Sequence, residues 1–363
     1  MKKKTKGWET VWEGRLLLTG LCLAVGLGWS AARAQEDHSE HDMSSEGADA
    51  QSAESHADHD MSPELMAELR AKVRMYKDYS DQQIMLSMEM MGRDYPLYVS
   101  DKSLQGDVGV LILGHGFREV GDKRFTESMS ELSSVFPTAI GFGMAMMSSS
   151  HIQTSIDELE AAGAKTIVVV PTVSTKYTEL YRQYLYILGL ADEAAYASVP
   201  RVSSNAELIF ADPPGDDPLM AETILDFANE MGDNPANELV IVVAHGPTAD
   251  DENAASLQIL DTLAGYIKQD GGFVDVKTVS LQDDAPLAIR SANVERLRAM
   301  VKEANEAGQK VIIVSNLMAA RSIQAKIRKD LDGLDYVFNS KGLTEHPNFV
   351  KWLTQTVRSK IES

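Results

Sequence analysis

From residue 106 onward the chain alternates short apolar runs with longer amphipathic stretches. Residues 108–113 are continuously apolar, as is typical of a parallel strand that is buried on both faces. Hydrophobic periodicity places further strands at residues 139–142, 166–170 and 206–211, and helices at residues 125–135, 152–162, 177–188 and 218–231. This alternation of strands and helices predicts a parallel sheet flanked by helices.

The same order then occurs a second time. Strands are expected at residues 239–244, 274–280, 311–315 and 336–338, and helices at residues 251–268, 287–307, 317–330 and 347–361. The copies also match in sequence, since LILGHG at 111–116 corresponds to IVVAHG at 241–246, and GAKTIVVV at 163–170 to GQKVIIV at 308–314. The repeat predicts an α/β protein of two tandem doubly wound parallel-sheet lobes, residues 105–235 and 236–363.

A methionine-rich segment, residues 63–104, precedes the first lobe and is predicted to be helical. Ser62 and Pro63 supply a cap and a first-turn proline for a helix over residues 62–79. A further group of methionines follows at helical spacing, and we expect these side chains to pack against the protein rather than to bind metal: Met85, Met88, Met90 and Met91.

The first 34 residues have the pattern of a secretory signal peptide. Basic residues at the start are followed by a short apolar run at residues 16–29 and by the small-residue site Ala32-Arg33-Ala34. We predict cleavage after Ala34, a periplasmic location and no stable membrane insertion afterwards, with an uncleaved anchor as the alternative. Cys22, the single cysteine, lies in this segment, and a mature chain without cysteine suits an oxidising compartment.

Residues 35–62 form a polar, acidic tail with almost no large apolar side chain, and we expect it to be disordered. Within it the motif H-x-[ED]-H-D-M occurs twice and contributes four histidines: His38, His41, His56 and His59. Imidazole, carboxylate and thioether groups together suit Cu, Ni, Co or Zn, so the tail is predicted to bind metal in an exchangeable way. The alternative is a solvated linker with incidental histidines.

The charge of the chain excludes one class of partner. The formal net charge is −20, and removal of residues 1–34, which carry six Lys or Arg and two Glu, makes it −24. Nucleic-acid binding needs a basic stripe, and the sequence has none. An acidic surface attracts cations, although solubility alone would also explain it.

Two histidines occupy equivalent positions in the repeat. His115 and His245 each follow the first strand of their lobe, and each precedes a glycine, Gly116 or Gly246. Ligands of open parallel sheets bind beyond the carboxyl ends of the strands, where these imidazoles are expected to lie and where the glycines let a flat ligand approach. A single such histidine could be an ordinary loop residue, but two at equivalent positions indicate a function.

These motifs together resemble one known family. The H-G pair, DELEAAGAK at 157–165, IVVVP at 167–171 and SLQDDAPL at 280–287 are similar to segments of the sirohydrochlorin cobalto- and ferrochelatases, which are class II chelatases, over residues 105–361. The resemblance implies insertion of a divalent metal, usually Co2+ or Fe2+, into a tetrapyrrole without ATP. Such chemistry needs an imidazole or carboxylate for the metal, a base for the pyrrole protons and a cleft for the macrocycle.

The chain departs from the family pattern at two places. A second family histidine is replaced by Glu179 in the first lobe, and residues 316–323 of the second lobe offer Arg321 but no histidine. The acidic residue usual after the second strand corresponds to Met146 in the first lobe and Gln282 in the second.

The resemblance therefore predicts that the first lobe carries the chemistry. His115 and Glu179 are the expected catalytic and metal-binding pair, with Met146 or His151 near them, while the second lobe presents His245 as a metal ligand. Several aspartates lie on loops at the same end of the second sheet, where helix capping explains them equally well: Asp250, Asp251, Asp283 and Asp284.

The predicted function is that of a sirohydrochlorin cobaltochelatase-like protein acting on a tetrapyrrole and a divalent metal, which could be Co2+, Ni2+, Fe2+, Zn2+ or Cu. The alternative is a non-catalytic periplasmic carrier of metal or tetrapyrrole, derived from a chelatase. Export and the histidine-rich tail favour the carrier, and the two H-G pairs favour the enzyme. A protein-interaction module is a third class, supported only by the methionine-rich helices.

Overall fold

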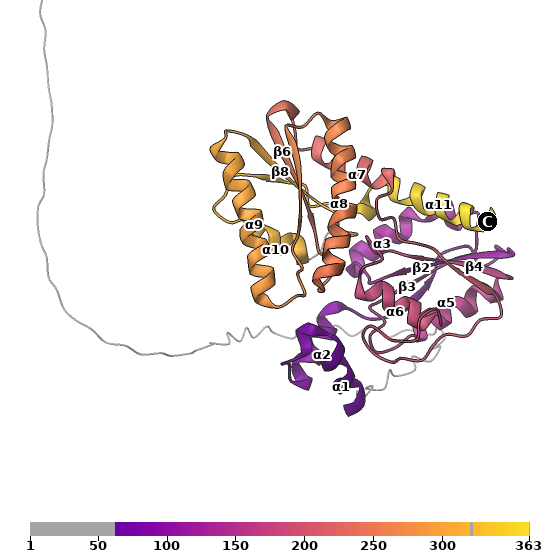
Figure 1. Ribbon diagram of the computed structural model, residues 1–363. Helices are drawn as coiled ribbons and strands as arrows, with labels where there is room; N and C mark the ends of the chain where they lie inside the picture. Colours follow the sequence, from indigo (N-terminus) through magenta and orange to yellow (C-terminus); the bar gives the residue numbers. More distant parts are fainter. Residues whose placement is uncertain (1–61, 320–321, 363) are drawn as a thin grey trace, which may run out of the picture. The chain divides into compact units, whose positions relative to one another are not determined.

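The computed structural model describes residues 62–319 and 322–362, which all belong to one compact unit (Figure 1). Its strands are β1 (Tyr95–Tyr98), β2 (Val108–Gly114), β3 (Thr138–Phe142), β4 (Thr166–Pro171), β5 (Glu207–Phe210), β6 (Glu238–Ala244), β7 (Asp275–Ser280), β8 (Lys310–Ser315) and β9 (Val337–Phe338). Its α-helices are α1 (Pro63–Lys72), α2 (Asp81–Met91), α3 (Arg118–Ser128), α4 (Ser130–Ser133), α5 (Ser150–Ala161), α6 (Glu179–Ile187), α7 (Pro218–Asn229), α8 (Asp250–Gly271), α9 (Leu287–Glu306), α10 (Ser322–Asp330) and α11 (Pro347–Glu362). Three 3₁₀ turns complete the chain at Arg74–Tyr76, Pro235–Asn237 and Leu343–Glu345.

The strands form two sheets that share the order of four parallel strands. The first has the order β1-β3-β2-β4-β5, and the second has the order β7-β6-β8-β9. All pairs are parallel except β1 with β3, which is antiparallel. Since β7-β6-β8-β9 repeats β3-β2-β4-β5, the prediction of an α/β protein with two tandem doubly wound lobes is confirmed.

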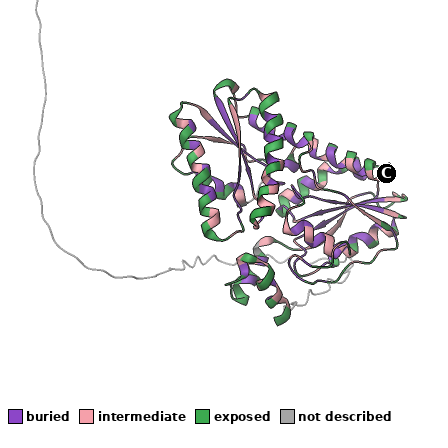
Figure 2. Ribbon diagram, in the orientation of Figure 1, coloured by how far each residue is buried: buried purple, intermediate pink, exposed green. Residues whose placement is uncertain are grey.

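Both faces of each sheet are covered, as the continuous apolar runs require (Figure 2). In β2, Val110 and Ile112 belong to one apolar cluster, whereas Leu111 and Leu113 belong to another on the opposite face. Strand β6 alternates in the same way between two clusters. Helix α5 contacts β1, β2 and β3, while α8 contacts β6 and β7 and α9 contacts β7 and β8.

The last helix of each repeat packs against the other repeat. Helix α7, which follows β5, contacts α8 and β8 of the second sheet, and α11, at the end of the chain, contacts α7 and β4 of the first sheet. One apolar cluster therefore contains residues of both sheets together with Phe227 of α7 and Phe349 of α11. The two lobes share part of their core, because each contributes a helix to it.

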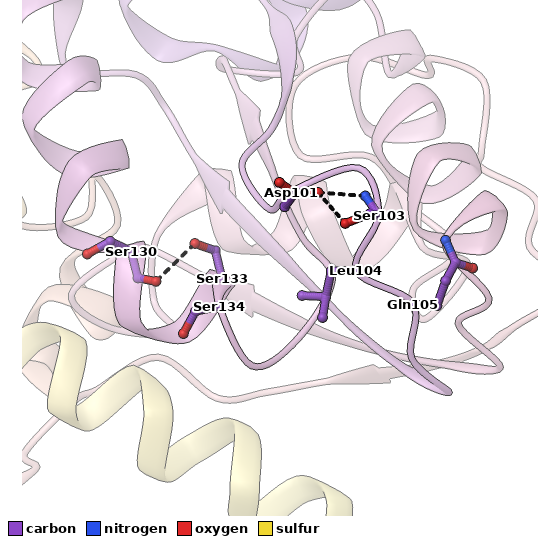
Figure 3. Close-up of a pocket in the computed structure, with 7 residues that line it drawn as sticks. All are labelled: Asp101, Ser103, Leu104, Gln105, Ser130, Ser133 and Ser134. Atoms are coloured by element: carbon purple, nitrogen blue, oxygen red, sulfur yellow. Dashed lines mark hydrogen bonds between the residues drawn. The ribbon is translucent and has the colours of Figure 1, made fainter.

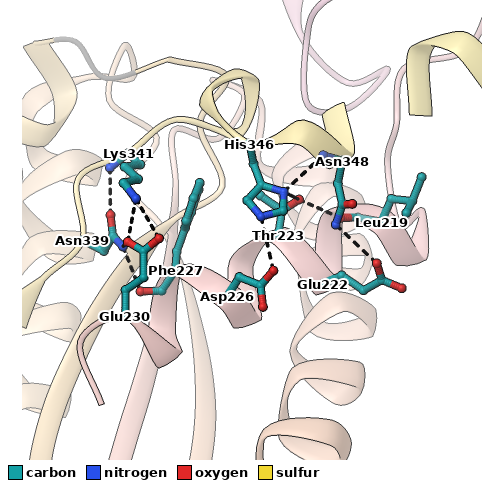
Figure 4. A network of polar contacts seen from close by, with 10 residues as sticks. All are labelled: Leu219, Glu222, Thr223, Asp226, Phe227, Glu230, Asn339, Lys341, His346 and Asn348. Carbon is teal, nitrogen blue, oxygen red and sulfur yellow. Dashed lines mark hydrogen bonds and ion pairs between the residues drawn. The ribbon is translucent and has the colours of Figure 1, made fainter. Parts of the chain in front are cut away.

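A polar network joins α7 to the segment that leads into α11 (Figure 4). His346 Nε2 lies 3.2 Å from Asp226 Oδ2, and its Nδ1 accepts a hydrogen bond from the Asn348 amide at 3.2 Å. Lys341 Nζ donates to both oxygens of Glu230 at 2.7 Å. His346 therefore has a structural role, joining α7 to the start of α11.

Several predicted elements differ in their bounds. The helix predicted over residues 62–79 ends at Lys72, because Val73 adopts an extended backbone and a 3₁₀ turn follows. Helix α3 begins at Arg118, before the predicted 125, since its polar first turns show no apolar periodicity. Helix α10 is described only from Ser322, and α6 begins at Glu179.

Strand β1 was not predicted, and residues 63–104 are therefore not entirely helical. Its sequence, YPLY, contains Pro96, which normally argues against a strand. The strand is tolerated because it pairs on one side only, at the edge of the first sheet. The segment before the first lobe thus supplies one strand of that lobe's sheet.

The packing interpretation of the methionines holds for part of the group. Met88 is buried and Met91 packs against the same cluster, but Met85 is 45% exposed. The signal peptide and the four tail histidines lie outside the described residues. Among the described residues, no helix combines the length and the apolar character needed to cross a membrane.

Candidate functional site

The two H-G pairs have nearly the same conformation in the two lobes. Gly116 and Gly246 have φ angles of 78° and 75°, in the left-handed region that favours glycine. Nδ1 of His115 lies 2.5 Å from the Gly116 carbonyl oxygen, and Nδ1 of His245 lies 2.9 Å from that of Gly246. A ring whose Nδ1–H donates to a carbonyl presents Nε2 outward, which is the orientation a ligand histidine needs.

The strand register relates the loop after β3 in the first lobe to the loop after β7 in the second. Gly114 pairs with Phe142 in the first sheet, and Ala244 pairs with Ser280 in the second. Met146 and Asp284 each come four residues after those partners, in loops of seven residues (143–149) and six residues (281–286). The loop of the second lobe contains two acidic residues, Asp283 and Asp284, besides Gln282, which was predicted as the counterpart of Met146.

The second-lobe loop brings two carboxylates to His245. Among the residues that the structure describes, the group of three or more His, Cys, Asp or Glu whose possible metal-ligand atoms all lie within 4.8 Å of one another consists of His245, Asp283 and Asp284. His245 Nε2 is 3.3 Å from Asp284 Oδ2, and Asp284 is half exposed. One imidazole and two carboxylates form a donor set that a divalent transition-metal ion can use.

The electrostatics of this cluster favour a cation at its centre. Burial of the ring disfavours the imidazolium, but the Asp284 carboxylate outweighs that effect and raises the pKa of His245 to about 9. Burial likewise opposes ionisation of Asp284, yet His245 and Lys326 hold the pKa of its carboxyl below the usual value. In the metal-free protein the cluster therefore attracts positive charge, here a proton on His245.

Asp283 is the buried member of the cluster and has two basic partners. Its side chain is 1% exposed, and it accepts from Arg290 Nε at 2.7 Å and from Lys326 Nζ at 2.5 Å. Arg290 also donates to both oxygens of Asp330, at 2.7 and 3.4 Å. Helices α9 and α10 thereby fix the position of the Asp283 carboxylate.

Backbone geometry positions the loop that carries the two aspartates. Gln282 has a φ of 47°, and its side chain accepts from Asn293 at 3.1 Å and donates to Asp250 at 3.3 Å. The Asp283 amide donates to the His245 carbonyl at 3.2 Å. These bonds tie the loop after β7 to the loop after β6, so His245 and the aspartates form one unit.

Comparison with known proteins gives relatives of one kind. A sirohydrochlorin cobaltochelatase of Methanothermobacter thermautotrophicus is 27% identical over 137 residues, which are 35% of this chain and 94% of that protein. One of Saccharolobus islandicus is 27% identical over 123 residues, 34% of this chain and 94% of that protein. No family model matches the chain.

Among solved structures, SirB from Bacillus subtilis with Fe3+ matches with a TM-score of 0.52 at 17% identity, covering 70% of this chain and 96% of that one. The chain shares the fold of that protein, and the two sequence relatives named above are sirohydrochlorin cobaltochelatases. The sequence relatives each match about a third of this chain, a length close to one of its lobes.

In the first lobe, His115 lies beside an aromatic residue, Phe117. Its ring meets that of Phe117 edge-on at 5.3 Å. Asp122, the nearby carboxylate, accepts from the Phe117 amide and from the Tyr95 hydroxyl, the latter at 2.7 Å. Met146 is buried in an apolar cluster, 4% exposed.

Glu179, the predicted partner of His115, begins α6 and contacts the second lobe. Its Oε1 accepts from the Thr248 hydroxyl at 2.8 Å and lies 3.9 Å from Arg182. Arg182 in turn pairs with Glu252 of α8. These contacts tie α6 to the loop after His245, and Glu179 is not in the three-residue cluster.

His151 is buried in the core of the first lobe. Both ring nitrogens lack a hydrogen bond among the described residues, and burial lowers the pKa of the imidazole to about 4. Asp94 lies 3.9 Å from it, and burial raises the pKa of that carboxyl to about 6. The Met144 amide donates a hydrogen bond to the Asp94 carboxylate at 3.0 Å, so Asp94 helps to hold the loop after β3 in place.

A hollow elsewhere on the first lobe lies at the opposite, amino end of its strands (Figure 3). It has a volume of about 490 Å³ and is lined mainly by serines and by Asp101. The Asp101 carboxylate already accepts from the Ser103 amide and hydroxyl at 2.8 and 2.6 Å. Because the hollow lies at the amino ends of the strands, it is separate from the site at their carboxyl ends.

The cluster could have been found partly from sequence. SLQDDAPL, which follows the second strand of the second lobe, placed two aspartates at the carboxyl edge. Helix capping seemed an equal explanation, but neither Asp283 nor Asp284 caps a helix, since α9 begins after Pro286 without a side-chain cap. Nothing in the sequence indicated that both aspartates lie beside His245, since that proximity arises only in the folded loops.

Proposed function

We propose that this protein is a chelatase-like enzyme that inserts a divalent metal ion into a tetrapyrrole, with the metal bound in the second lobe. The observation that carries the proposal is the cluster of His245, Asp283 and Asp284 at the carboxyl edge of the second sheet. The two sequence relatives named sirohydrochlorin cobaltochelatase support the reaction class. Sirohydrochlorin and Co2+ are therefore the proposed substrates to test first.

The residues of the cluster suit the individual steps of such a reaction. Imidazole and carboxylate donors bind Co2+, Ni2+, Fe2+ or Zn2+, and binding displaces the proton from His245. Insertion also requires a base that accepts the pyrrole N–H protons close to the metal. Asp284 is half exposed and adjacent to His245, so it is the carboxylate of the cluster that can face a bound macrocycle.

The test is anaerobic incubation of the protein with sirohydrochlorin and Co2+, followed by the absorbance of the tetrapyrrole. Wild type is expected to turn over repeatedly, and His245→Ala is expected to lose about 100-fold or more of that rate. His115→Ala is the matched variant in the other lobe and should retain most of the rate. Loss of turnover in His115→Ala with normal turnover in His245→Ala would assign the reaction to the first lobe and overturn the proposal.

A non-catalytic carrier of metal or tetrapyrrole is the second candidate. It is favoured by the first lobe, where Ala145 and Met146 stand in the loop that carries the aspartates in the second. A single retained cluster is sufficient to bind one metal ion without any catalysis. A carrier would bind Co2+ stoichiometrically in a His245-dependent way and would release no metallated tetrapyrrole.

We also propose that the mature protein acts in the periplasm, on the basis of the signal-peptide pattern of residues 1–34 and the doubled histidine motif of the tail. The mature chain would then begin at Gln35. Cell fractionation with N-terminal sequencing tests this, and recovery of the intact amino terminus in the cytoplasmic fraction would contradict it.

A further inference from the structure

Lys326 occupies the position beside Asp283 where a metal ion would contribute positive charge. We infer that Lys326 is an internal competitor of the metal: it neutralises Asp283 in the empty site and moves into solvent when the ion binds. This inference rests on the proposed metal site. It concerns how tightly that site holds its metal.

The buried state of Asp283 makes a permanent positive partner necessary. Its side chain is 1% exposed, and an unpaired carboxylate buried to that extent is strongly destabilising. Arg290 engages Oδ1 at 2.7 Å, and Lys326 engages Oδ2 at 2.5 Å. Without a metal, each oxygen of this carboxylate has its own basic partner.

The two partners differ in how firmly they are held. Arg290 is 17% exposed, and its guanidinium is shared with Asp330 through two further hydrogen bonds. Lys326 is 48% exposed, and its side chain makes one hydrogen bond among the described residues, to Asp283. A lysine is a point charge on a flexible stem, whereas an arginine fork is rigid. Lys326 is therefore the partner that can leave.

Departure of Lys326 follows from the charge of an incoming ion. The possible ligand atoms of Asp283 and Asp284 lie within 4.8 Å of one another and of that of His245. A divalent ion bound by the same two carboxylates would repel an ammonium group at contact distance. Metal and Lys326 therefore compete for Asp283, while Arg290 keeps the carboxylate in place throughout.

Competition of this kind weakens metal binding by the free energy of the lysine contact. A protein that delivers its metal to a macrocycle gains from a site that is well shaped but not tight. As the ion leaves, Lys326 returns and Asp283 does not remain uncompensated. The lysine thus favours release as well as opposing capture.

The experiment is a titration with Co2+ of the full chain in which His38, His41, His56 and His59 are replaced by Asn, so that the tail does not contribute. Lys326→Met is expected to lower the Kd about two- to fivefold, the range of a partly exposed ion pair. Lys326→Arg, which keeps the charge, should not lower it. The matched control is Lys329→Met, which removes the same charge from an exposed position of the same helix.

The outcomes separate this inference from the proposed function. Tighter binding in Lys326→Met than in Lys329→Met, with an unchanged Co2+ absorption spectrum, supports the competition because it shows that the lysine is not a ligand. Equal or weaker binding in Lys326→Met overturns it. If His245→Ala abolishes Co2+ binding but Lys326→Met does not bind Co2+ more tightly than wild type, the metal site stands and only the competition by Lys326 fails. If neither wild type nor Lys326→Met binds Co2+, both fail.

Discussion

The loops after the second strand of each lobe have the same place in the fold and different chemistry. In the first lobe the loop contains Ala145 and Met146, both buried in an apolar cluster. In the second lobe it contains Asp283 and Asp284 beside His245. The two edges have the same strand order, and among the described residues the cluster of a histidine with two carboxylates lies at the second of them.

The loop of the first lobe belongs to an apolar cluster that also includes side chains of the segment before that lobe. Helices α1 and α2 contribute Met66, Ile84 and Met88 to the apolar cluster that also contains Met146. A carboxylate at the position of Met146 would be buried among these side chains at high cost. In the second lobe the Asp284 side chain is half exposed, although Arg74 of the segment before the first lobe donates to the Thr248 carbonyl at 3.0 Å.

The largest expected effect concerns whether the two lobes unfold together or independently. Phe349 of α11 is fully buried in the cluster that joins both sheets, 6.1 Å from Phe125 and 5.4 Å from Trp352 between ring centres. Phe349→Ala should lower the free energy of unfolding by about 3–5 kcal/mol, because it leaves a cavity in this shared core. Urea unfolding followed by circular dichroism should still show one transition.

The control for this variant is Ile361→Ala, at an exposed position of the same helix, which should change stability by less than about 0.5 kcal/mol. Two resolved transitions in Phe349→Ala, only one of them shifted, would show that the lobes unfold independently. The helix exchange would then not couple them.

The next variant, Asp284→Asn, removes a negative charge from the loop of the second lobe and so makes it more like the loop of the first. Asp284→Asn keeps the shape of the side chain but removes the carboxylate 3.3 Å from His245. Affinity for Co2+ should fall about tenfold or more, as for loss of a ligand or its immediate partner. Calorimetry of the variant with the tail histidines replaced would measure this.

Asp251→Asn is the matched control, since it removes an exposed carboxylate at the start of α8 outside the cluster. Equal losses in the two variants would mean that general surface charge, and not the cluster, attracts the ion. The contrast between the two lobes would then have no consequence for metal binding.

Much of the fold could be predicted from sequence, for identifiable reasons. Strands such as β2 and β6 are buried on both faces, so their residues form continuous apolar runs that require no knowledge of the partner strands. Strand β1 is half-buried and contains Pro96, and its pairing with β3 depends on long-range contact. The packing of α7 and α11 against the opposite lobe could not be predicted from the sequence, because an apolar helix face does not specify which sheet it covers.

The candidate site could be predicted only in part. The positions of His115 and His245 follow from the strand–loop pattern, and the structure places both at carboxyl edges. Whether Glu179 takes part in metal binding remains a prediction, since its described partners are Thr248 and Arg182. The roles of Lys326 and Arg290 could not be read from sequence, because they come from helices far along the chain that meet Asp283 only in the folded state.

The smallest expected effect concerns the contact of α1 with the rest of the first lobe. Glu68 of α1 accepts from the Ser198 amide at 2.9 Å, from the Ser198 hydroxyl at 2.6 Å and from Lys72 at 2.8 Å. Burial raises the pKa of this carboxyl, but the bonds to Lys72 and Ser198 outweigh it and lower the pKa to about 2. Because the folded-state pKa lies below the ordinary value of 4.5, the ionised group stabilises the fold above pH 4.5, and this contribution is lost as the pH falls towards 2.

Glu68→Gln should therefore lower the free energy of unfolding by about 1 kcal/mol at pH 7, a value reduced for solvent screening of a partly exposed group. The difference from wild type should shrink between pH 4.5 and 2 and vanish near the lower limit, as measured by urea unfolding at several pH values. Glu89→Gln, on the exposed side of α2, should show no such dependence. A penalty for Glu68→Gln that persists unchanged at pH 2 would mean that the carboxylate charge does not hold α1 on the first lobe.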